Sequence, residues 1–325
     1  MQQPISRLQG LIEGHISKHN YGERPIELYE PISYLMALGG KRLRPLLTLI
    51  GYYMFKEHPS KILDQALAVE VFHNFTLMHD DIMDEAPLRR GQVTVHEKWN
   101  SNTAILSGDV MLVKAYDLLL ATDKKYLLKT LKLFNTCAAE VCEGQQMDMV
   151  FENRKTVTEH EYLEMIRLKT AVLLGTSLRL GALLAGADKA NQQALYKFGV
   201  NIGIGFQLKD DLLDVYADKE KFGKQVGGDI IANKKTFLLI KAKELATGRM
   251  EQQLQSWLEL KDFNGEEKVK GVTEIYNSLG IKQLAEVKMN EYFESAHSSL
   301  RKLDAPMQRK SMLKEFAESL IGRES

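Results

Sequence analysis

The sequence predicts an all-α protein, and two observations support that prediction. Only seven prolines occur among the 325 residues, and long stretches contain neither proline nor glycine, the two residues that interrupt helices most strongly. No segment shows the alternating pattern of a half-buried strand. Because no linker rich in proline or serine divides the chain, we expect residues 1–325 to form one helical domain.

Glycine and proline set the expected helix boundaries. Gly39-Gly40 should stop the second helix, and Pro45 suits the first turn of the third. The break at His58-Pro59-Ser60 precedes the fourth helix, and Pro87–Val95 and Lys219–Lys234 are predicted as loops. The predicted helices span Ile5–Lys18, Ile26–Leu38, Pro45–Phe55, Lys61–Met83, Thr103–Ala121, Lys125–Val150, Thr158–Ala187, Lys189–Val215, Thr236–Ala246, Glu251–Leu260, Glu267–Ser299 and Met307–Ile321.

Three glycines lie inside the predicted helix Lys189–Val215, namely Gly199, Gly203 and Gly205. Each costs about 1 kcal/mol of helix stability relative to alanine. We therefore expect them to allow the helix backbone to approach a neighbouring segment or a ligand closely.

Composition excludes several classes of protein. The 43 basic and 43 acidic residues give a formal net charge of zero, so no global positive field suggests a nucleic-acid partner. Cys137 and Cys142 lie five apart in a predicted helix, which suits a reducing cytoplasm and no disulfide framework. Met1–Gly10 lacks the apolar core of a signal peptide. Arg179 interrupts the apolar region Ala171–Ala187, so we expect a buried helix, no membrane span and a cytoplasmic protein.

Two matched acidic motifs dominate the sequence. Asp80-Asp81-Ile82-Met83-Asp84 ends one apolar stretch, and Asp210-Asp211-Leu212-Leu213-Asp214 ends another 130 residues later. The first and last aspartate of each motif are four apart, so they share one helix face. A lone motif of this kind is as often a solvated helix face. Two copies favour a site for Mg²⁺, which proteins hold with a few carboxylates and substrate phosphates.

Basic residues accompany both motifs. Lys41 and Arg44 lie at a helix start, where backbone N–H groups also attract phosphate. Any single lysine or arginine could be an ordinary surface charge, but the set follows the acidic motifs closely. The other members are Arg89, Arg90, Lys169 with Thr170, Lys224 and Lys234. Acidic residues for metal and basic residues for phosphate together indicate a site that processes diphosphates.

With these motifs in the same order, the chain resembles the trans-isoprenyl diphosphate synthases, or polyprenyl synthetases, over nearly its whole length. The resemblance is to the short-chain geranylgeranyl and farnesyl type. One departure is Val93, where the family often has proline. The matching segments are Gly-Gly-Lys-Arg-Leu-Arg-Pro (39–45), Asp-Asp-Ile-Met-Asp (80–84), Arg-Arg-Gly (89–91), Gly-Gln-Gln-Met-Asp (144–148), Lys-Thr (169–170) and Gly-Phe-Gln-Leu-Lys-Asp-Asp-Leu-Leu-Asp (205–214).

The resemblance implies an isoprenoid synthase bundle around a deep central cavity. It also implies three Mg²⁺ ions on the diphosphate of an allylic substrate. The expected ligands are Asp80, Asp84 and Asp210, supported directly or through water by Asp81, Asp211 and Asp214, with Asp148 and Gln145 bracing the metal site. The final proton acceptor in this family is usually the released pyrophosphate.

The resemblance further implies two substrate sites. Arg89, Lys169, Lys234 and nearby Lys224 are expected to bind the allylic diphosphate, and Thr170 and Gln207 to lie beside the reacting carbons. Lys41, Arg44, His73 and Arg90 are expected to bind isopentenyl diphosphate. His73, two helical turns before Asp80, could instead be an ordinary hydrogen-bonded core histidine.

Product length should depend on side chains that precede Asp80 on its helix. Five residues span about 7.5 Å of helix, so Phe75 and Phe72 could close the floor of the pocket. Thr76 is smaller than the aromatic residue found there in many animal farnesyl enzymes. We expect a C20 product first and C15 next, although Phe75 could also be ordinary core.

Three alternatives remain at this stage. A class I terpene cyclase would share the first motif, but Lys41, Arg44 and Arg90 argue against it. A medium-chain or long-chain polyprenyl diphosphate synthase would share every motif. A non-catalytic partner subunit typically loses motif aspartates, and all six are present. The family resemblance also implies a homodimer.

Overall fold

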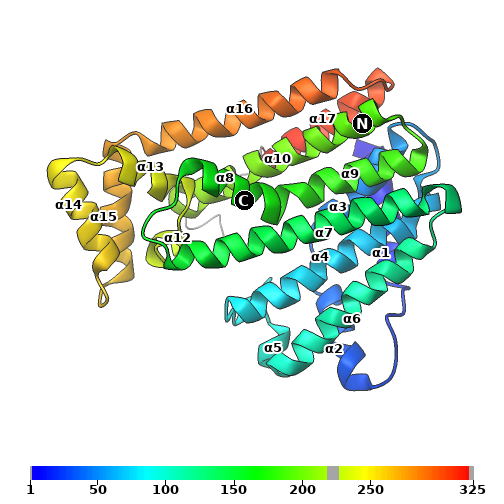
Figure 1. Ribbon diagram of the computed structural model, residues 1–325, viewed down its shortest axis with the longest axis horizontal. Helices are drawn as coiled ribbons and strands as arrows, with labels where there is room; N and C mark the ends of the chain where they lie inside the picture. Colours follow the sequence, from blue (N-terminus) through cyan, green and yellow to red (C-terminus); the bar gives the residue numbers. More distant parts are fainter. Residues whose placement is uncertain (1, 218–226, 322–325) are drawn as a thin grey trace. The chain divides into compact units, whose positions relative to one another are not determined.

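The computed structural model describes residues 2–217 and 227–321, and these residues are mostly helical (Figure 1), which confirms the all-α prediction. Their contacts divide the chain into two compact units. Unit 1 comprises Met1–Cys137, Leu173–Tyr196 and Leu303–Met312, and unit 2 comprises Ala138–Val172, Lys197–Lys302 and Leu313–Ser325. The single domain expected from the sequence stays a prediction.

Unit 1 is built around helix α4. Its core residues Leu67, Val69, Val71 and Phe72 are each at most 2% exposed, so the helix is enclosed on several sides. Each such side chain contributes about 1.5–3 kcal/mol on burial. The elements of unit 1 are α1 (Gln2–Ile16), α2 (Ile26–Ala37), α3 (Leu43–Tyr53), the 3₁₀ turn η1 (Pro59–Ile62), α4 (Leu63–Met83), α5 (Val95–Lys98), α6 (Ser101–Leu120), α9 (Val172–Ala185) and the first parts of α7 (Lys124–Asn153), α10 (Lys189–Tyr216) and α17 (Met307–Ile321).

Helix α4 and helix α6 pack along each other in unit 1 (Figure 1). Helix α3 and helix α9 meet backbone to backbone. A Cβ atom on Gly51 would lie 2.2 Å from the carbonyl oxygen of Leu178, and one on Gly181 would lie 2.0 Å from that of Thr48. Both positions therefore require glycine.

Unit 2 contains the larger part of α10, from Lys197 onward. A Cβ atom on Gly205 would lie 2.3 Å from the ring of Phe293, which confirms the expected close approach at that glycine. Thr158 begins α8 with a capping box to Glu161, a local arrangement that satisfies two backbone donors. The further elements are α8 (Glu159–Ile166), the π-helical turn η2 (Arg167–Ala171), α12 (Gly228–Ile231), α13 (Phe237–Leu245), α14 (Gly248–Glu259), α15 (Gly265–Ser278) and α16 (Ile281–Arg301).

Three secondary-structure predictions are wrong. The loop predicted over Lys219–Lys234, of which residues 219–226 lie outside the described residues, contains helix α12. The single helix predicted over Glu267–Ser299 is two helices, because Gly280 adopts a left-handed φ of 67° between α15 and α16. The loop Pro87–Val95 contains a small hairpin of strand β1 (Leu88–Arg89) and strand β2 (Gln92–Val93). Strands of two residues show no alternation that a sequence could reveal.

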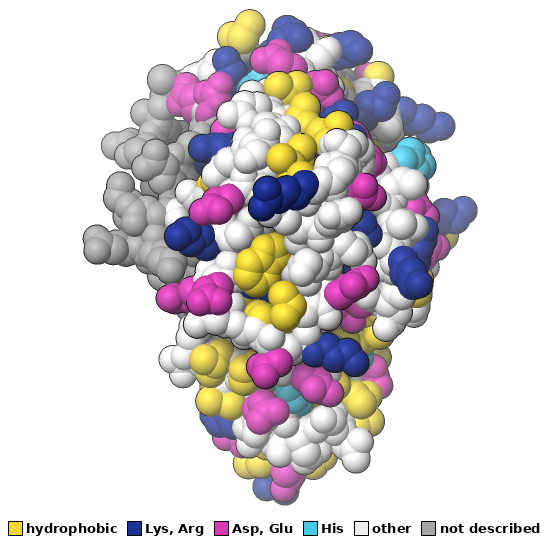
Figure 2. Space-filling view, turned by 90° about the vertical axis from the view of Figure 1, so that its left-hand side faces the viewer, with side chains coloured by type: hydrophobic (Ala, Val, Ile, Leu, Met, Phe, Trp, Pro, Cys, Tyr) yellow, Lys and Arg dark blue, Asp and Glu magenta, His cyan; other side chains and the backbone are white. Residues whose placement is uncertain are grey.

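Residues Glu159–Ala185 form a helical stretch long and apolar enough to cross a membrane, and 83% of its most apolar window is buried inside the protein. This burial matches the core helix expected near Ala171–Ala187. On the face seen in Figure 2, Lys and Arg side chains are interspersed with Asp and Glu, as on ordinary solvated surfaces.

Candidate active site

The first acidic motif lies at the end of α4 in unit 1. Asp80 and Asp81 occupy the last turn, and Asp84 is the residue that ends the helix. Asp81 is only 2% exposed. Arg89 reaches it from β1, with Nη2 2.6 Å and Nε 2.8 Å from Oδ1. The buried carboxylate of Asp81 therefore holds the guanidinium of Arg89 in place.

The second acidic motif lies in unit 2, within α10, which continues to Tyr216 (Figure 1). Asp211 is only 5% exposed, and the hydroxyl of Tyr162 donates to its Oδ2. Burial is the main cause that raises the pKa of Asp211 to about 7. The hydrogen bonds from Tyr162 and Gln207 act in the opposite direction and limit this rise. This buried carboxylate is thus satisfied by neutral donors rather than by an arginine.

Asp229 is a candidate site residue that sequence reasoning missed. Its backbone N–H donates to Oδ2 of Asp214 at 3.0 Å. Burial raises the pKa of Asp229, and the charge of Lys234 lowers it. The carboxylates of Asp211, Asp214 and Asp229 therefore influence one another in unit 2. The only sequence indication was Gly-Gly-Asp at 227–229, near the end of a predicted loop.

Lys169 and Thr170 lie in the π-helical turn η2, an irregularity that occurs often at functional sites. The ammonium of Lys169 is 2.6 Å from Oδ2 of Asp148 on α7. A Cβ atom on Gly144 would lie 2.2 Å from the backbone nitrogen of Lys169, so glycine is needed for this approach. The hydroxyl of Thr170 donates to Oε1 of Gln207 at 3.5 Å.

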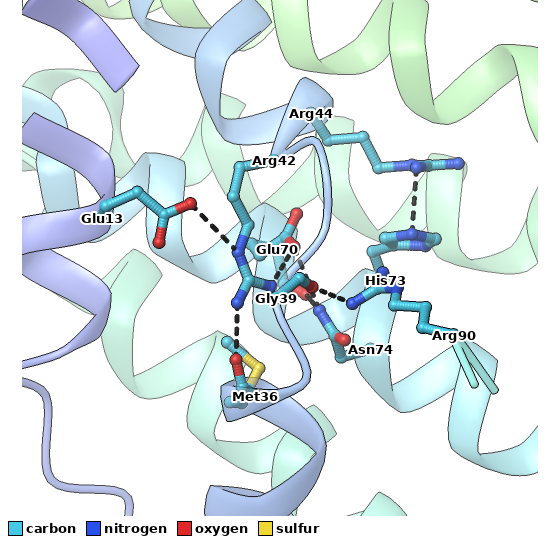
Figure 3. A network of polar contacts seen from close by, with 9 residues as sticks. All are labelled: Glu13, Met36, Gly39, Arg42, Arg44, Glu70, His73, Asn74 and Arg90. Atoms are coloured by element: carbon cyan, nitrogen blue, oxygen red, sulfur yellow. Dashed lines mark hydrogen bonds and ion pairs between the residues drawn. The ribbon is translucent and has the colours of Figure 1, made fainter. Parts of the chain in front are cut away.

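A cluster of basic residues forms in unit 1 around His73 (Figure 3). Nη1 of Arg44 donates to Nε2 of His73 at 3.0 Å, and the guanidinium of Arg90 donates to the carbonyl oxygen of Gly39. Burial and four neighbouring arginines hold the pKa of His73 well below its ordinary value. His73 is therefore a neutral acceptor at physiological pH. Lys41 is exposed in the short segment that connects α2 to α3.

Arg42 and Glu70 form a buried ion pair that sequence reasoning also missed. Nη1 of Arg42 lies 2.8 Å from Oε1 of Glu70, and both side chains are 3% exposed. Nη2 of Arg42 donates to the carbonyl oxygen of Met36 at 2.5 Å, and Asn74 donates to Glu70 (Figure 3). Arg42 itself has a left-handed φ of 44°. This pair fixes residues 39–42, which lead into α3, against α4.

The guanidinium groups of this cluster suit an anion. Burial is the main cause that lowers the pKa of Arg44 and of Arg90. In the part of the chain that the structure describes, Nε of Arg44 is buried without a hydrogen-bond partner. An added phosphate would supply acceptors and offset the repulsion among the arginines.

Aromatic side chains gather around the part of α4 that precedes the first motif. Phe72 is 1% exposed, and its ring lies 5.7 Å from that of Phe75 and 5.1 Å from that of Phe134. Tyr116 continues the row beyond Phe134, with ring centroids 5.2 Å apart. The hydroxyl of Thr76 donates to the carbonyl oxygen of His73. Phe134 and Tyr116 extend the aromatic set that the sequence predicted.

The structure thus brings together some of the predicted residues within each unit. Asp81 meets Arg89, and Arg44 meets His73, in unit 1. Lys169 meets Asp148 in unit 2, where the charge of Lys234 acts on Asp211. Gln145 is 8% exposed on α7, and Lys224 lies outside the described residues.

The carboxylates present fit a magnesium site. Mg²⁺ prefers hard oxygen ligands and usually completes its coordination with water and substrate phosphates. Among residues 2–217 and 227–321, no group of three or more His, Cys, Asp and Glu side chains lies close enough to hold a metal ion. Oxygens of a substrate phosphate are donors that would complete such a site.

Comparison with known proteins decides the family. The sequence profile of the polyprenyl synthetase family matches residues 25–276. The chain belongs to the polyprenyl synthetase family. It is 40% identical over 310 residues to the geranylgeranyl pyrophosphate synthase of Geoglobus acetivorans, covering 93% of this chain and 92% of that protein.

Other relatives of this polyprenyl synthetase agree. It is 37% identical over 262 residues to the geranylfarnesyl diphosphate synthase of Natronomonas pharaonis, covering 75% of this chain and 77% of that protein. A crystal structure of a geranylgeranyl pyrophosphate synthase matches it with a TM-score of 0.94 and 42% identity over 99% of both chains. The chain is a trans-prenyltransferase of the short-chain type, and these relatives do not favour a terpene cyclase.

Proposed function

We propose that this polyprenyl synthetase joins isopentenyl diphosphate to an allylic diphosphate and makes a C20 all-trans prenyl diphosphate, with C15 as the next candidate. The observation that supports it best is the pair of aspartate motifs, each with basic side chains in its own unit. The first relative, a geranylgeranyl pyrophosphate synthase at 40% identity, supports C20.

Ionisation of the allylic substrate is the demanding step. Its C–O bond breaks, and the pyrophosphate leaves with the electron pair. Three Mg²⁺ ions, held by Asp80, Asp84 and Asp210, would supply Lewis-acid stabilisation of that leaving group. Arg89 and Lys169 bind the same diphosphate with Lys234 and Lys224. Because Asp81 and Asp148 already orient Arg89 and Lys169, these donors need little rearrangement when charge develops.

Condensation follows at the second substrate. Lys41, Arg44, His73 and Arg90 bind the diphosphate of isopentenyl diphosphate. Its double bond attacks the allylic cation, a carbon–carbon bond forms, and loss of a proton to the released pyrophosphate restores a double bond. Thr170 and Gln207 lie beside the reacting carbons, and Asp211 and Asp214 with Gln145 support the metal ligands. An apolar pocket excludes the water that would otherwise trap the cation.

Product mass tests this function. Purified protein is incubated with Mg²⁺, isopentenyl diphosphate and each of dimethylallyl, geranyl and farnesyl diphosphate. We expect elongation to stop at C20 and to disappear when EDTA removes the metal. A cyclic hydrocarbon without elongation would overturn the proposal, and products of C30 or longer would exclude a short-chain product.

Phe75 tests the control of chain length. Shortening Phe75 to alanine opens the aromatic row that also contains Phe72 and Phe134, so the product should gain at least one C5 unit. Phe263→Ala removes the same side chain in unit 2 and should leave the product unchanged. An unchanged product distribution in Phe75→Ala would show that Phe75 is ordinary core.

A homodimer is proposed from an exposed apolar stripe on α6. Leu106, Val113 and Leu120 repeat every seven residues, and each is at least 57% exposed. Such a stripe suits pairing with a second copy of the same helix. Light scattering should show a dimer for the native chain and a monomer for Val113→Asp, and a monomeric native chain would contradict this.

We further propose that the enzyme is cytoplasmic and does not span a membrane.

A further inference from the structure

A pocket in unit 2 is lined by none of the residues proposed above to bind metal or substrate. It measures about 690 Å³. Its walls come from residues 154–158 after α7, from α13 and α14, and from the segment that leads into α13. The cavity is large enough for a small organic or inorganic diphosphate, and its lining combines basic side chains with apolar ones such as Val157, Leu239 and Leu258.

Four basic residues line this pocket: Arg154, Lys155, Lys235 and Lys243. The ammonium of Lys235 donates to the carbonyl oxygen of Glu152 at 3.1 Å, and that of Lys243 donates to the carbonyl oxygen of Lys155 at 2.7 Å. An ammonium group has three N–H donors, so each lysine can also bind a ligand. The two lysines repel each other electrostatically, which an anion between them would relieve.

The carboxylates near this pocket have other partners. Arg154 is paired with Glu161, with Nη1 2.7 Å from Oε1. Glu244 lies 2.7 Å from the ammonium of Lys241, and Glu259 accepts a hydrogen bond from Gln255 at 2.6 Å. Gln255 is neutral and leaves the charge of Glu259 in place, and the charge of Glu152 acts on Lys235. Even so, four cationic and two anionic side chains line the pocket, so its lining is net positive and an anionic ligand is the complementary one.

The pocket adjoins the proposed active site along the chain. Asn233 lines it with a left-handed φ of 54° and donates to the carbonyl oxygen of Leu258 on α14 at 3.0 Å. The next residue is Lys234, whose backbone N–H donates to the carbonyl oxygen of Asp229 at 2.9 Å. An anion bound at Lys235 would thus act beside a residue proposed to bind the allylic diphosphate.

We propose that this pocket is a further diphosphate site, separate from the two substrate sites, which binds the anion through Lys155, Lys235 and Lys243 without a metal ion. The anion can be free pyrophosphate or the head group of a prenyl diphosphate. Identification of either one as the enzyme's own product rests on the proposed function, whereas the anion site rests only on the geometry of unit 2.

Trp257 provides the measurement, because its neighbours Gln255 and Leu258 line the pocket. The chain has only two tryptophans, and Trp99 packs edge-to-face against Tyr34 in unit 1. In a Trp99→Phe background, fluorescence therefore reports on α14 alone. Titration with inorganic pyrophosphate in EDTA should give a saturable change, because EDTA removes the metal that the active site needs.

Charge variants decide whether the lysines bind the anion. Lys235→Gln together with Lys243→Gln should weaken binding at least about tenfold, the loss expected for charge-assisted hydrogen bonds. Lys270→Gln, exposed on α15, is the matched control and should bind normally. The double arginine variant keeps both charges and should restore binding if the glutamine variant is folded. No saturable change, or equal affinity in the glutamine variant, would overturn the proposal.

Three ligands separate the two sources of the anion. Tighter binding of farnesyl diphosphate than of pyrophosphate assigns the site to a prenyl diphosphate, and equal or weaker binding assigns it to free pyrophosphate. Binding of farnesol but not of pyrophosphate would contradict a diphosphate site. Because the titration needs no turnover, a failed elongation assay would remove the proposed function and leave this result intact.

Discussion

The two aspartate motifs have the same spacing, but their buried members are satisfied in different ways. Asp81 and Asp211 are 2% and 5% exposed, respectively. Arg89 supplies a positive charge to Asp81. Asp211 receives a hydrogen bond from the neutral hydroxyl of Tyr162 and lies near the carboxylate of Asp229. The first buried charge is therefore paired directly with an arginine, whereas the second is held by neutral donors and is influenced by the charge of Lys234.

This difference assigns separate tasks to the two motifs. A carboxylate paired with arginine is a fixed part of the structure, because removing either partner leaves an uncompensated charge. Burial disfavours the charged form of a carboxylate that has only neutral donors, so its ionisation gains more from a cation supplied from outside. We infer that the second motif depends more strongly on bound metal for its stability, while the outer aspartates of both motifs serve the metal directly.

The largest effect should come from the outer aspartates. Asp80→Ala and Asp210→Ala should each lower kcat/KM by at least about 10²–10³, the loss typical for one electrostatic group at a reacting centre. Steady-state assays at saturating Mg²⁺ measure this. Glu85→Ala, an exposed carboxylate just after the first motif, should retain most activity. A mild loss at only one motif would show that the two motifs do not share the metal task.

The middle aspartates should change stability in opposite directions in metal-free protein. Asp81→Asn leaves Arg89 without its counter-charge and should cost about 3 kcal/mol. Asp211→Asn keeps an acceptor for Tyr162 and removes a buried charge, so it should stabilise by about 1 kcal/mol or more at pH 8. Urea unfolding in EDTA measures both, with the exposed Asp84→Asn as the control near zero.

The pH dependence sharpens this contrast. Because the folded pKa of Asp211 is raised to about 7, the unfolded chain loses that proton first as pH rises. The folded state then binds more protons, and the free energy of unfolding falls from about pH 4 to pH 7. Asp211→Asn should flatten this slope, and Mg²⁺ should raise the stability of the native chain at pH 8. An unchanged slope in Asp211→Asn would mean that Asp211 ionises at an ordinary pH.

Local sequence patterns predicted most helices and the motif carboxylates, because glycine, proline and residue spacing act over a few residues. The side chains that pair with these residues are set by tertiary packing, which the local sequence does not reveal. Arg42 and Glu70 are 28 residues apart, and Tyr162 and Asp211 are 49 apart, beyond any helical spacing. The break at Gly280 was missed because one glycine costs a helix only about 1 kcal/mol. Family resemblance supplied residue roles that spacing alone did not.

The smallest effect should come from His73 in unit 1. Burial and the arginines around it lower its folded pKa well below the ordinary value, so the unfolded chain binds a proton first as pH falls. Stability should therefore drop below about pH 6.5, by at most about 1.4 kcal/mol per pH unit. His73→Gln keeps an acceptor for Arg44 and should lose this acid slope.

Urea midpoints at pH 5.5 and 7.5 measure the slope for the native chain and for His73→Gln. His160→Gln is the control, because His160 is exposed in unit 2 and should leave the slope unchanged. Acid would then weaken unit 1 through His73, whereas neutral pH without metal weakens unit 2 through Asp211. Equal slopes in the native chain and His73→Gln would mean that His73 accepts a proton in the folded state. Arg44 would then have no neutral acceptor at His73. The arginines would have to bind a diphosphate in an arrangement other than the one seen here.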